Sequence, residues 1–178
     1  MKEHIIKTLE TERLMLRQIK EEDAQTVFNN WTSDDEVSKF VRWSTHKNVE
    51  ETLEYIKNTQ ERCKKENNYY EWGIVLKEEK ELIGAIGAFP GEDGRIEIGY
   101  NLSKKYWRNG YMTEALKRVM NYLIDDEGIK RFVCSHAVLN PASGRVMQKA
   151  GFKYVKNTVC EKFDGSQKFD TRVYYLDV

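Results

Sequence analysis

The sequence predicts an α/β domain with a mixed, mostly antiparallel central sheet of about seven strands and about four flanking helices. Segments with two-residue alternation are interspersed with segments of helical periodicity. Three consecutive strands are joined by short turns, which favours an antiparallel meander. The later strands are interrupted by helices, so the sheet is expected to be mixed.

The length and composition fit one domain spanning residues 1–178. The chain has 178 residues, of which 40% are hydrophobic, enough for a core of ordinary size. No repeat, linker or low-complexity segment divides it. We expect residues 1–9 to form a flexible N-terminal extension.

Charge and cysteine content exclude several classes of protein. Lys plus Arg and Asp plus Glu number 29 each, so no bulk charge favours nucleic acid or an anionic membrane. The three cysteines are far apart and imply no disulfide framework. The N-terminus lacks the apolar core of a signal peptide, and no apolar run approaches the roughly 20 residues of a membrane helix. These features predict a cytoplasmic protein.

The first half of the chain predicts a strand, two helices and the meander. Residues 13–17 form a strand, and the acids Glu21, Glu22 and Asp23 suit the start of a helix that continues through Trp31. Asn48 opens a second helix, which ends near residue 66. The meander strands are Tyr70–Leu76, 82–89 and 95–100. Inside the second of them, Gly84 and Gly87 indicate a bulge or close packing.

The second half alternates helices and strands. A long amphipathic helix spans about residues 110–126, and a strand follows at 132–138. Asn140 and Pro141 are typical of a helix start, which we expect Asn140 to cap, and this helix stops at Gly151. Two last strands, 153–163 and 171–177, flank a turn at 164–166.

Residues 106–115 read Tyr-Trp-Arg-Asn-Gly-Tyr-Met-Thr-Glu-Ala and join a strand to the long helix. A helix N-terminus offers unpaired N–H groups and a positive dipole end, which favour a phosphate. Gly110 allows a close approach of the backbone to a ligand, and Arg108 could contact a phosphate. Taken alone, the segment is better explained as an ordinary capped turn between a strand and a helix, because single-glycine turns are common. A second segment, residues 140–152, reads Asn-Pro-Ala-Ser-Gly-Arg-Val-Met-Gln-Lys-Ala-Gly-Phe and fits an ordinary capped helix.

Together, these two segments resemble the GNAT acetyltransferase superfamily, and specifically its RimJ/RimL-like branch. Residues 11–17, 70–74 and 96–100 also resemble that branch, so the resemblance runs from about residue 10 to the C-terminus. It implies a single-domain GNAT fold whose sheet is splayed in the middle. It also implies an enzyme that uses acetyl-CoA as a cosubstrate, without a metal.

The resemblance assigns the coenzyme site to a strand, a turn and two helix starts. The strand would pair with the pantetheine arm, the turn would hold the pyrophosphate, and Asn140 would hydrogen-bond the pantetheine end. The implied residues are Tyr100, Asn101, Leu102, Trp107, Arg108, Asn109, Gly110, Tyr111, Met112, Thr113, Asn140 and Ser143. Many family members carry Gly where Arg108 stands and Gly or Ala where Met112 stands. An inward orientation of either side chain would obstruct the phosphate site.

Acetyl transfer to an amine requires oxyanion stabilisation, a neutral amine and a departing thiolate. A backbone N–H near Tyr100 or Asn101, where the family strand bulges, would supply the first. The Tyr that many members use to protonate the thiolate is replaced by Met147, and the branch instead points to Ser143, which could equally serve only the helix start. Glu161 and Glu97 match candidate positions for the base, and each is also explained as an exposed strand residue.

The acceptor is expected to be a primary amine. An α-amino group has a pKa of about 7.7–8.0, against about 10.4 for Lys, so a protein N-terminus is the easier acceptor without a strong base. This agrees with the branch's link to ribosomal-protein N-termini. A small amine, such as a polyamine or an antibiotic, is the alternative. A non-catalytic acyl-CoA-binding module is a further alternative, and a homodimer is left open.

Other candidate sites are weaker. The chain has neither a P-loop nor a Gly-x-Gly-x-x-Gly fingerprint. Cys134 and His136 lie on one strand face without further ligands, so we expect a structural role and no metal. Phe40 and Trp43 lie in a segment that lines the acceptor cleft in the superfamily; packing explains them equally well. Direct transfer requires no nucleophilic cysteine.

Overall fold

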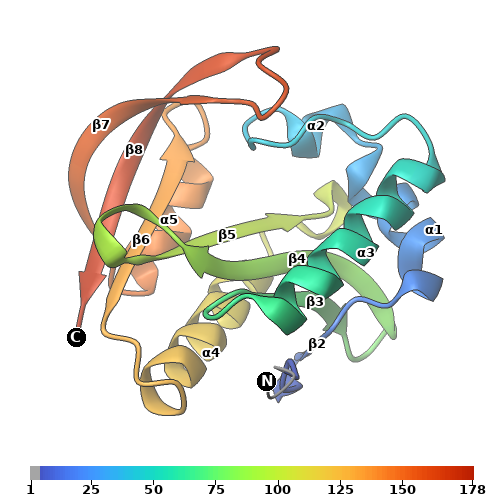
Figure 1. The fold of residues 1–178 in the computed structure, drawn as a ribbon, viewed down its shortest axis with the longest axis horizontal. Coiled ribbons are helices and arrows are strands. Elements are labelled where there is room, and N and C mark those ends of the chain that lie inside the picture. The colour runs from blue at the N-terminus through green and yellow to red at the C-terminus, as the bar shows by residue number, and fades with distance from the viewer. Residues whose placement is uncertain (1–4) are drawn as a thin grey trace.

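The computed structural model describes residues 5–178, whose strands form one sheet with helices on both faces (Figure 1). The strands are β1 (Leu9–Glu10), β2 (Leu14–Arg17), β3 (Tyr70–Leu76), β4 (Glu81–Pro90), β5 (Ile96–Leu102), β6 (Arg131–Ala137), β7 (Lys153–Glu161) and β8 (Lys168–Asp177). Their order across the sheet is β1-β2-β3-β4-β5-β6-β8-β7. Among these strands only β5 and β6 pair in parallel, which confirms the mixed, mostly antiparallel sheet and the meander β3–β4–β5.

The helices of the described part of the chain are α1 (Ala24–Val27), α2 (Asp35–Ser38), α3 (Val49–Lys65), α4 (Tyr111–Asp125) and α5 (Pro141–Lys149). α1 is the middle of a longer helical stretch, which starts with a 3₁₀ turn at Glu21–Asp23 and ends with a π turn at Phe28–Thr32. The Asp34 side chain caps α2 by accepting the Glu36 N–H. The prediction of about four helices did not include this short helix. No helix within residues 5–178 combines the length and the apolar character needed to cross a bilayer.

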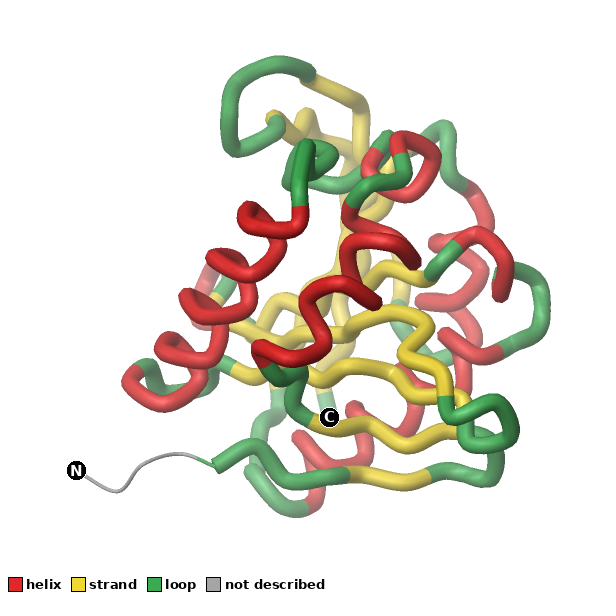
Figure 2. The backbone as a smooth tube through the Cα atoms, turned by 90° about the vertical axis from the view of Figure 1, so that its right-hand side faces the viewer, coloured by secondary structure: helices red, strands yellow, loops and turns green. Residues whose placement is uncertain are grey.

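The helices cover the two faces of the sheet with separate hydrophobic clusters. On one face α1 and α3 bury Val27 and Ile56 against strand residues such as Ala85. On the other face α4 and α5 bury residues such as Leu116 and Met147 in the larger cluster. Figure 2 shows helices on both sides of the sheet. Each face of the sheet therefore has its own helical layer.

Part of the expected N-terminal extension contacts the core. Residues 1–4 of the expected extension lie outside the described residues. Ile6 and Leu9 are buried in the main core, and β1 pairs with β2 through Leu9 and Leu16. Because a two-residue strand leaves no alternation pattern, the predicted sheet of about seven strands lacked β1.

The two predicted asparagine caps behave differently. The Asn48 side chain accepts the Glu51 N–H (3.0 Å) and caps α3, as predicted. Asn140 precedes α5, with Pro141 in the first turn, but its side chain makes no capping hydrogen bond. The prediction that Asn140 caps α5 is therefore wrong, and its amide is left for other partners.

Local irregularities in the sheet lie in β4 rather than in β5. The β3–β4 register shifts so that Ile83 is an extra residue between the paired Leu82 and Gly84. In contrast, β4 and β5 pair regularly through Gly84 and Leu102. The bulge expected near Tyr100 or Asn101 is therefore absent from this strand pair.

Candidate functional site

A gap opens in the middle of the sheet between β5 and β6. The two strands pair only through residues 96–98 of β5 and 132–134 of β6. Beyond that point β5 continues to Leu102 and β6 to Ala137, so residues 99–102 have no strand partner on this side. An exposed strand edge can pair with an extended ligand. The gap therefore offers backbone hydrogen bonds to a chain-like molecule.

The turn before α4 presents a row of unpaired N–H groups beside this gap. Arg108 (φ 65°) and Gly110 (φ 77°) both adopt left-handed conformations, which bend the backbone into a concave turn. Within the described part of the chain, no hydrogen-bond acceptor contacts the backbone N–H groups of residues 108–113. The positive end of the α4 dipole adds to these donors, so the turn suits a phosphate or diphosphate.

The two bulky residues of this turn, Arg108 and Met112, lie in different surroundings. Met112 is 7% exposed and packs into the main core. Arg108 is exposed, and its guanidinium has no hydrogen-bond or ion-pair partner among residues 5–178. The buried Met112 side chain therefore does not fill the concave turn, and the exposed Arg108 guanidinium is available as a cation for an anionic ligand.

Three residues brace the turn from a distance. Glu114 accepts hydrogen bonds from the Arg13 backbone N–H (2.9 Å), from Arg13 Nε (2.7 Å) and from Thr11 Oγ1 (2.5 Å). Arg13 Nη1 also donates to the Asn109 carbonyl (2.9 Å). Burial acts to raise the pKa of Glu114, but these hydrogen bonds bring it below its usual value. The carboxylate is thus neutralised by Arg13, which reduces its repulsion of an anion at the turn.

Two further side chains of the predicted coenzyme set serve the turn itself. The Trp107 indole donates to the Leu102 carbonyl (2.7 Å), and Asn109 Nδ2 donates to the Tyr106 carbonyl (3.2 Å) and the Trp107 carbonyl (3.0 Å). The Arg13 guanidinium lies over the Tyr111 ring, 4.5 Å from its centroid. These contacts hold the shape of the turn, whereas the ligand-facing groups are backbone N–H groups.

Ser143 and Tyr100 form a hydroxyl pair at the gap. Ser143 Oγ donates to Tyr100 Oη (3.1 Å), and Tyr100 Oη donates to the Ser143 carbonyl (2.9 Å). Burial raises the pKa of Tyr100 well above its ordinary value, so the phenol is protonated at neutral pH. The start of α5 is thereby tied to the unpaired part of β5. The predicted set had included Tyr100 only for its backbone, and its side chain had been missed.

Met147 stands where many members of the family carry a tyrosine, and its side chain is part of the core. Met147 on α5 is 1% exposed and lies in the main hydrophobic cluster. The hydroxyl groups that lie near the gap instead are those of the Ser143–Tyr100 pair, which could supply a proton to a departing thiolate.

The two candidate bases lie in different surroundings. Glu97 is half-buried on β5, and burial raises the pKa of its carboxyl, with Arg42 nearby opposing the rise. Glu161 is exposed at the end of β7, and its backbone carbonyl accepts from Arg42 Nε (3.3 Å). No hydrogen bond or ion pair joins these two glutamates to each other among the described residues.

The loop between α2 and α3 packs against the tip of the β7–β8 hairpin. The buried ammonium of Lys162 donates to the carbonyls of Ser38 (2.7 Å), Val41 (2.9 Å) and Trp43 (3.0 Å). Arg42 lies over the Phe163 ring, 4.5 Å from its centroid. Trp43 packs partly against the α1–α3 cluster, and Phe40 is half-buried. Lys162, which sequence reasoning had missed, thus joins two segments distant in sequence.

Cys134 and His136 are used within the fold. Cys134 Sγ donates to the Ile98 carbonyl (3.1 Å), and His136 is hydrogen-bonded to the Ala137 carbonyl (2.8 Å) and Tyr174 Oη (3.2 Å). Within residues 5–178 no three His, Cys, Asp or Glu side chains gather as a metal site would require. These contacts agree with the structural role expected for both residues.

Comparison with known proteins identifies the family. Residues 13–153 match the acetyltransferase (GNAT) domain family. The uncharacterized N-acetyltransferase YoaA of Bacillus subtilis is 34% identical over 172 residues, covering 94% of this chain and 95% of YoaA. The fold of the present chain resembles that of RimL, a ribosomal L7/L12 α-N-protein acetyltransferase solved with coenzyme A (TM-score 0.83, 19% identity, 97% of this chain and 98% of RimL). It also resembles the microcin C7 self-immunity acetyltransferase MccE, solved with acetyl-CoA and AMP (TM-score 0.81, 18% identity, 94% of each chain). The chain is therefore an acyltransferase that belongs to the GNAT acetyltransferase family.

Proposed function

We propose that this protein transfers an acetyl group directly from acetyl-CoA to a primary amine. The observation that carries the proposal is the gap between β5 and β6 beside the unpaired N–H groups of residues 108–113. An extended pantetheine arm matches the unpaired edge of residues 99–102, and a diphosphate matches the concave turn. Acetyl-CoA would supply the activated acetyl thioester.

Side chains at the start of α5 would complete the coenzyme site. The Asn140 side chain has no hydrogen-bond partner among residues 5–178, so it is free to contact the pantetheine end. Ser143 Oγ would pass its proton to the departing thiolate, and Tyr100 Oη would hold Ser143 in place for this step. A backbone N–H near Tyr100 or Asn101 would stabilise the oxyanion, because this edge of β5 has no strand partner.

The acceptor in this proposal is a protein N-terminal α-amine, as in the RimJ/RimL-like branch. Its pKa of about 7.7–8.0 leaves part of it neutral at physiological pH, so it needs less help than a Lys amine of about 10.4. A carboxylate would take the proton of the amine, directly or through one water, and Glu97 and Glu161 are the candidates predicted from the sequence. The Asn140 and Ser143 positions support this branch, and the fold shared with RimL agrees with it. A small-molecule amine is the alternative acceptor.

An acceptor screen tests the proposal. Peptides with free N-termini, the same peptides with blocked N-termini, and small amines are mixed with acetyl-CoA and the full chain, and thiol release is measured. We expect release with the free N-termini. Release with small amines alone would exclude the N-terminal acceptor, and no release with any amine would contradict the proposal.

Asn140→Ala provides a direct check of the coenzyme site. We expect weaker binding of coenzyme A in calorimetry because an amide contact is lost. The unfolding temperature should change little, since Asn140 does not cap α5. Unchanged affinity would place the coenzyme elsewhere.

A further inference from the structure

A half-buried glutamate on β3, Glu71, has no cationic partner. No Lys, Arg or His among the described residues lies within ion-pair distance of its carboxylate. Within residues 5–178 the carboxylate accepts from Tyr55 on α3, whose Oη contacts both carboxylate oxygens at 2.7 Å. Buried carboxylates are normally paired with a positive group, because desolvation of an unpaired charge is costly. The missing counter-charge points to a cation from outside the chain.

The position of Glu71 in the sheet places it on the side where an acceptor would reach the gap. Its register partner on β4 is Gly87, and the partner of Gly87 on β5 is Gly99. Residues paired in this way project from the same face of a sheet, here the face covered by α3. Gly87 and Gly99 carry no side chains, and the Phe89 ring lies against both of them, so the surface between Glu71 and the unpaired part of β5 is aromatic.

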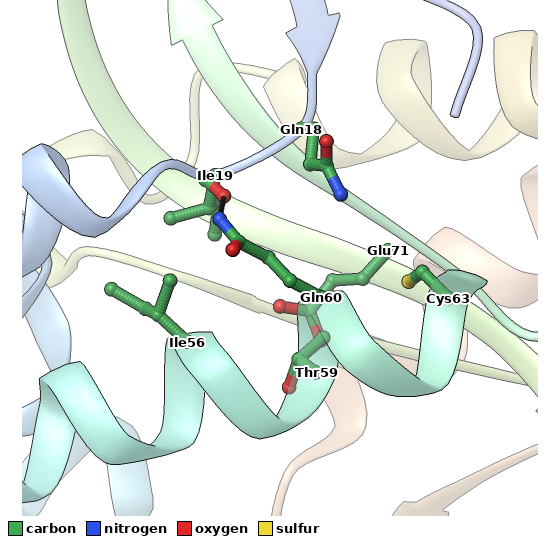
Figure 3. A pocket seen from close by; sticks show the side chains of 7 residues that line it. All are labelled: Gln18, Ile19, Ile56, Thr59, Gln60, Cys63 and Glu71. Carbon is green, nitrogen blue, oxygen red and sulfur yellow. Dashed lines mark hydrogen bonds between the residues drawn. The ribbon is translucent and has the colours of Figure 1, made fainter. Parts of the chain in front are cut away.

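Figure 3 shows the Glu71 side chain extending from β3 beneath α3, where it lines a small pocket with Thr59, Gln60 and Cys63. Glu71 and Tyr55 both keep partial solvent exposure. A carboxylate accepts about four hydrogen bonds, so the single Tyr55 hydroxyl leaves most of its capacity free. The carboxylate is therefore oriented by Tyr55 and keeps acceptor capacity for a further donor.

A second unsatisfied acceptor lies on the same face. Asn101 Oδ1 is buried without a hydrogen-bond partner among residues 5–178, and Asn101 is two residues beyond Gly99 on β5. Phe89, half-buried beside Gly87 and Gly99, adds an aromatic surface between these positions. Two hydrogen-bond acceptors and an aromatic ring match the requirements of an ammonium group.

We propose that Glu71, oriented by Tyr55, binds the ammonium group of the acceptor and takes its proton. The proton passes from the ammonium nitrogen to the Glu71 carboxylate, directly or through one water, which leaves a neutral amine. The N–C bond to the acetyl group then forms and the C–S bond breaks. The thiolate takes a proton from Ser143, and the second proton that the nitrogen loses on becoming an amide passes through water to restore the Ser143 hydroxyl. Glu71 finally releases its proton to solvent. The inference rests on the proposed acetyl transfer and names the acceptor site for it.

The acidity of Glu71 matches an α-amine better than a side-chain amine. Burial raises the pKa of Glu71 to about 7, although the Tyr55 hydrogen bond acts to lower it. The titratable groups facing it are Tyr55 and Cys63 on α3 and Tyr69 before β3, and burial raises the pKa of each, so all three are neutral near pH 7. Proton transfer from an α-ammonium is nearly balanced, whereas a Lys ammonium disfavours it by roughly a thousandfold. The site therefore favours amines of low basicity.

The test compares Glu71→Gln with the wild type. We expect kcat/KM for a peptide with a free N-terminus to fall by about 100-fold or more, and the acid limb of its pH profile near pH 7 to disappear. Coenzyme affinity in calorimetry should be unchanged. Tyr55→Phe should move that limb to higher pH, because the hydrogen bond that favours the carboxylate is lost. Glu78→Gln, at an exposed position in the turn between β3 and β4, is the matched control with wild-type kinetics.

The outcomes separate this inference from the proposed function. Acetylation by the wild type together with full activity and an unchanged acid limb in Glu71→Gln would overturn the role of Glu71. If the acid limb of the pH profile disappears in Glu97→Gln or Glu161→Gln and not in Glu71→Gln, that other glutamate is the base, and the role proposed for Glu71 is equally overturned. If the wild type acetylates no amine, the proposed function fails, and the inference fails with it. If Glu71→Gln does not fold, it will not bind coenzyme A. The shift of the acid limb to higher pH in Tyr55→Phe then decides the question, and an unshifted limb would overturn the role of Glu71.

Discussion

At the scale of single residues, the chemistry of the gap depends on the Ser143–Tyr100 pair. Ser143→Ala removes the hydroxyl that faces the expected thiolate, while the backbone carbonyl still accepts from Tyr100. We expect kcat to fall by about 100-fold with little change in coenzyme affinity, because the lost interaction acts in the reaction rather than in binding. Steady-state kinetics and calorimetry measure the two effects. Equal turnover in the variant would remove Ser143 from the mechanism, and Tyr100→Phe should lower kcat in the same direction.

Arg108 combines a strained conformation with a useful charge. A non-glycine residue at φ 65° costs roughly 1–2 kcal/mol relative to ordinary conformations. Arg108→Gly relieves this strain, offset in part by the larger freedom of glycine in the unfolded chain. We expect the free energy of unfolding to rise by up to about 1 kcal/mol, while coenzyme affinity falls because a cation beside the phosphate site is lost. Denaturant unfolding and calorimetry test both; tighter coenzyme binding in the variant would indicate that Arg108 obstructs the turn.

At the scale of elements, the start of α4 is held against β2 by Glu114. Glu114→Gln should lower the free energy of unfolding by about 1–2 kcal/mol near pH 7, because charge-assisted hydrogen bonds from Arg13 are weakened. The pKa of Glu114 is lowered in the fold, so its stabilisation is present above the unfolded value of about 4.3 and is lost as pH falls through the lower folded value. The difference between variant and wild type should therefore shrink in acid. A difference independent of pH would contradict this account, and Glu12→Gln, exposed and unpaired among the described residues, is the control.

The elements that could be predicted are those with a long periodic pattern. The meander and the helices α3 and α4 follow from alternation and helical spacing over seven or more residues. β1 and α2 could not be found, since two or four residues carry too little pattern. Asn140 was misjudged because a residue type favoured at helix starts also suits a ligand contact.

The candidate site likewise has a part that could be predicted from the sequence and a part that could not. The turn at Gly110 was predictable because its donors are backbone groups that follow directly from a helix start. The Arg13–Glu114 brace, the Tyr100 side chain and the Lys162 anchor were not, because each joins residues far apart in the sequence. A single sequence carries no signal for such pairings.

At the scale of the whole molecule, the splayed sheet creates two approaches to one point. The coenzyme would enter beside α4 and α5, and the acceptor would enter on the opposite face, which α3 covers. The two substrates can therefore be bound at once, as direct transfer without a covalent enzyme intermediate requires. The two faces meet only where β5 separates from β6, at residues 99–102.

The most direct test of this arrangement is a crystal structure of the full chain with coenzyme A. We expect diphosphate oxygens at about 3 Å from the N–H groups of residues 108–113, and the pantetheine arm along residues 99–102 between β5 and β6. A coenzyme bound elsewhere, with this turn closed by Arg108 or Met112, would contradict the central claim.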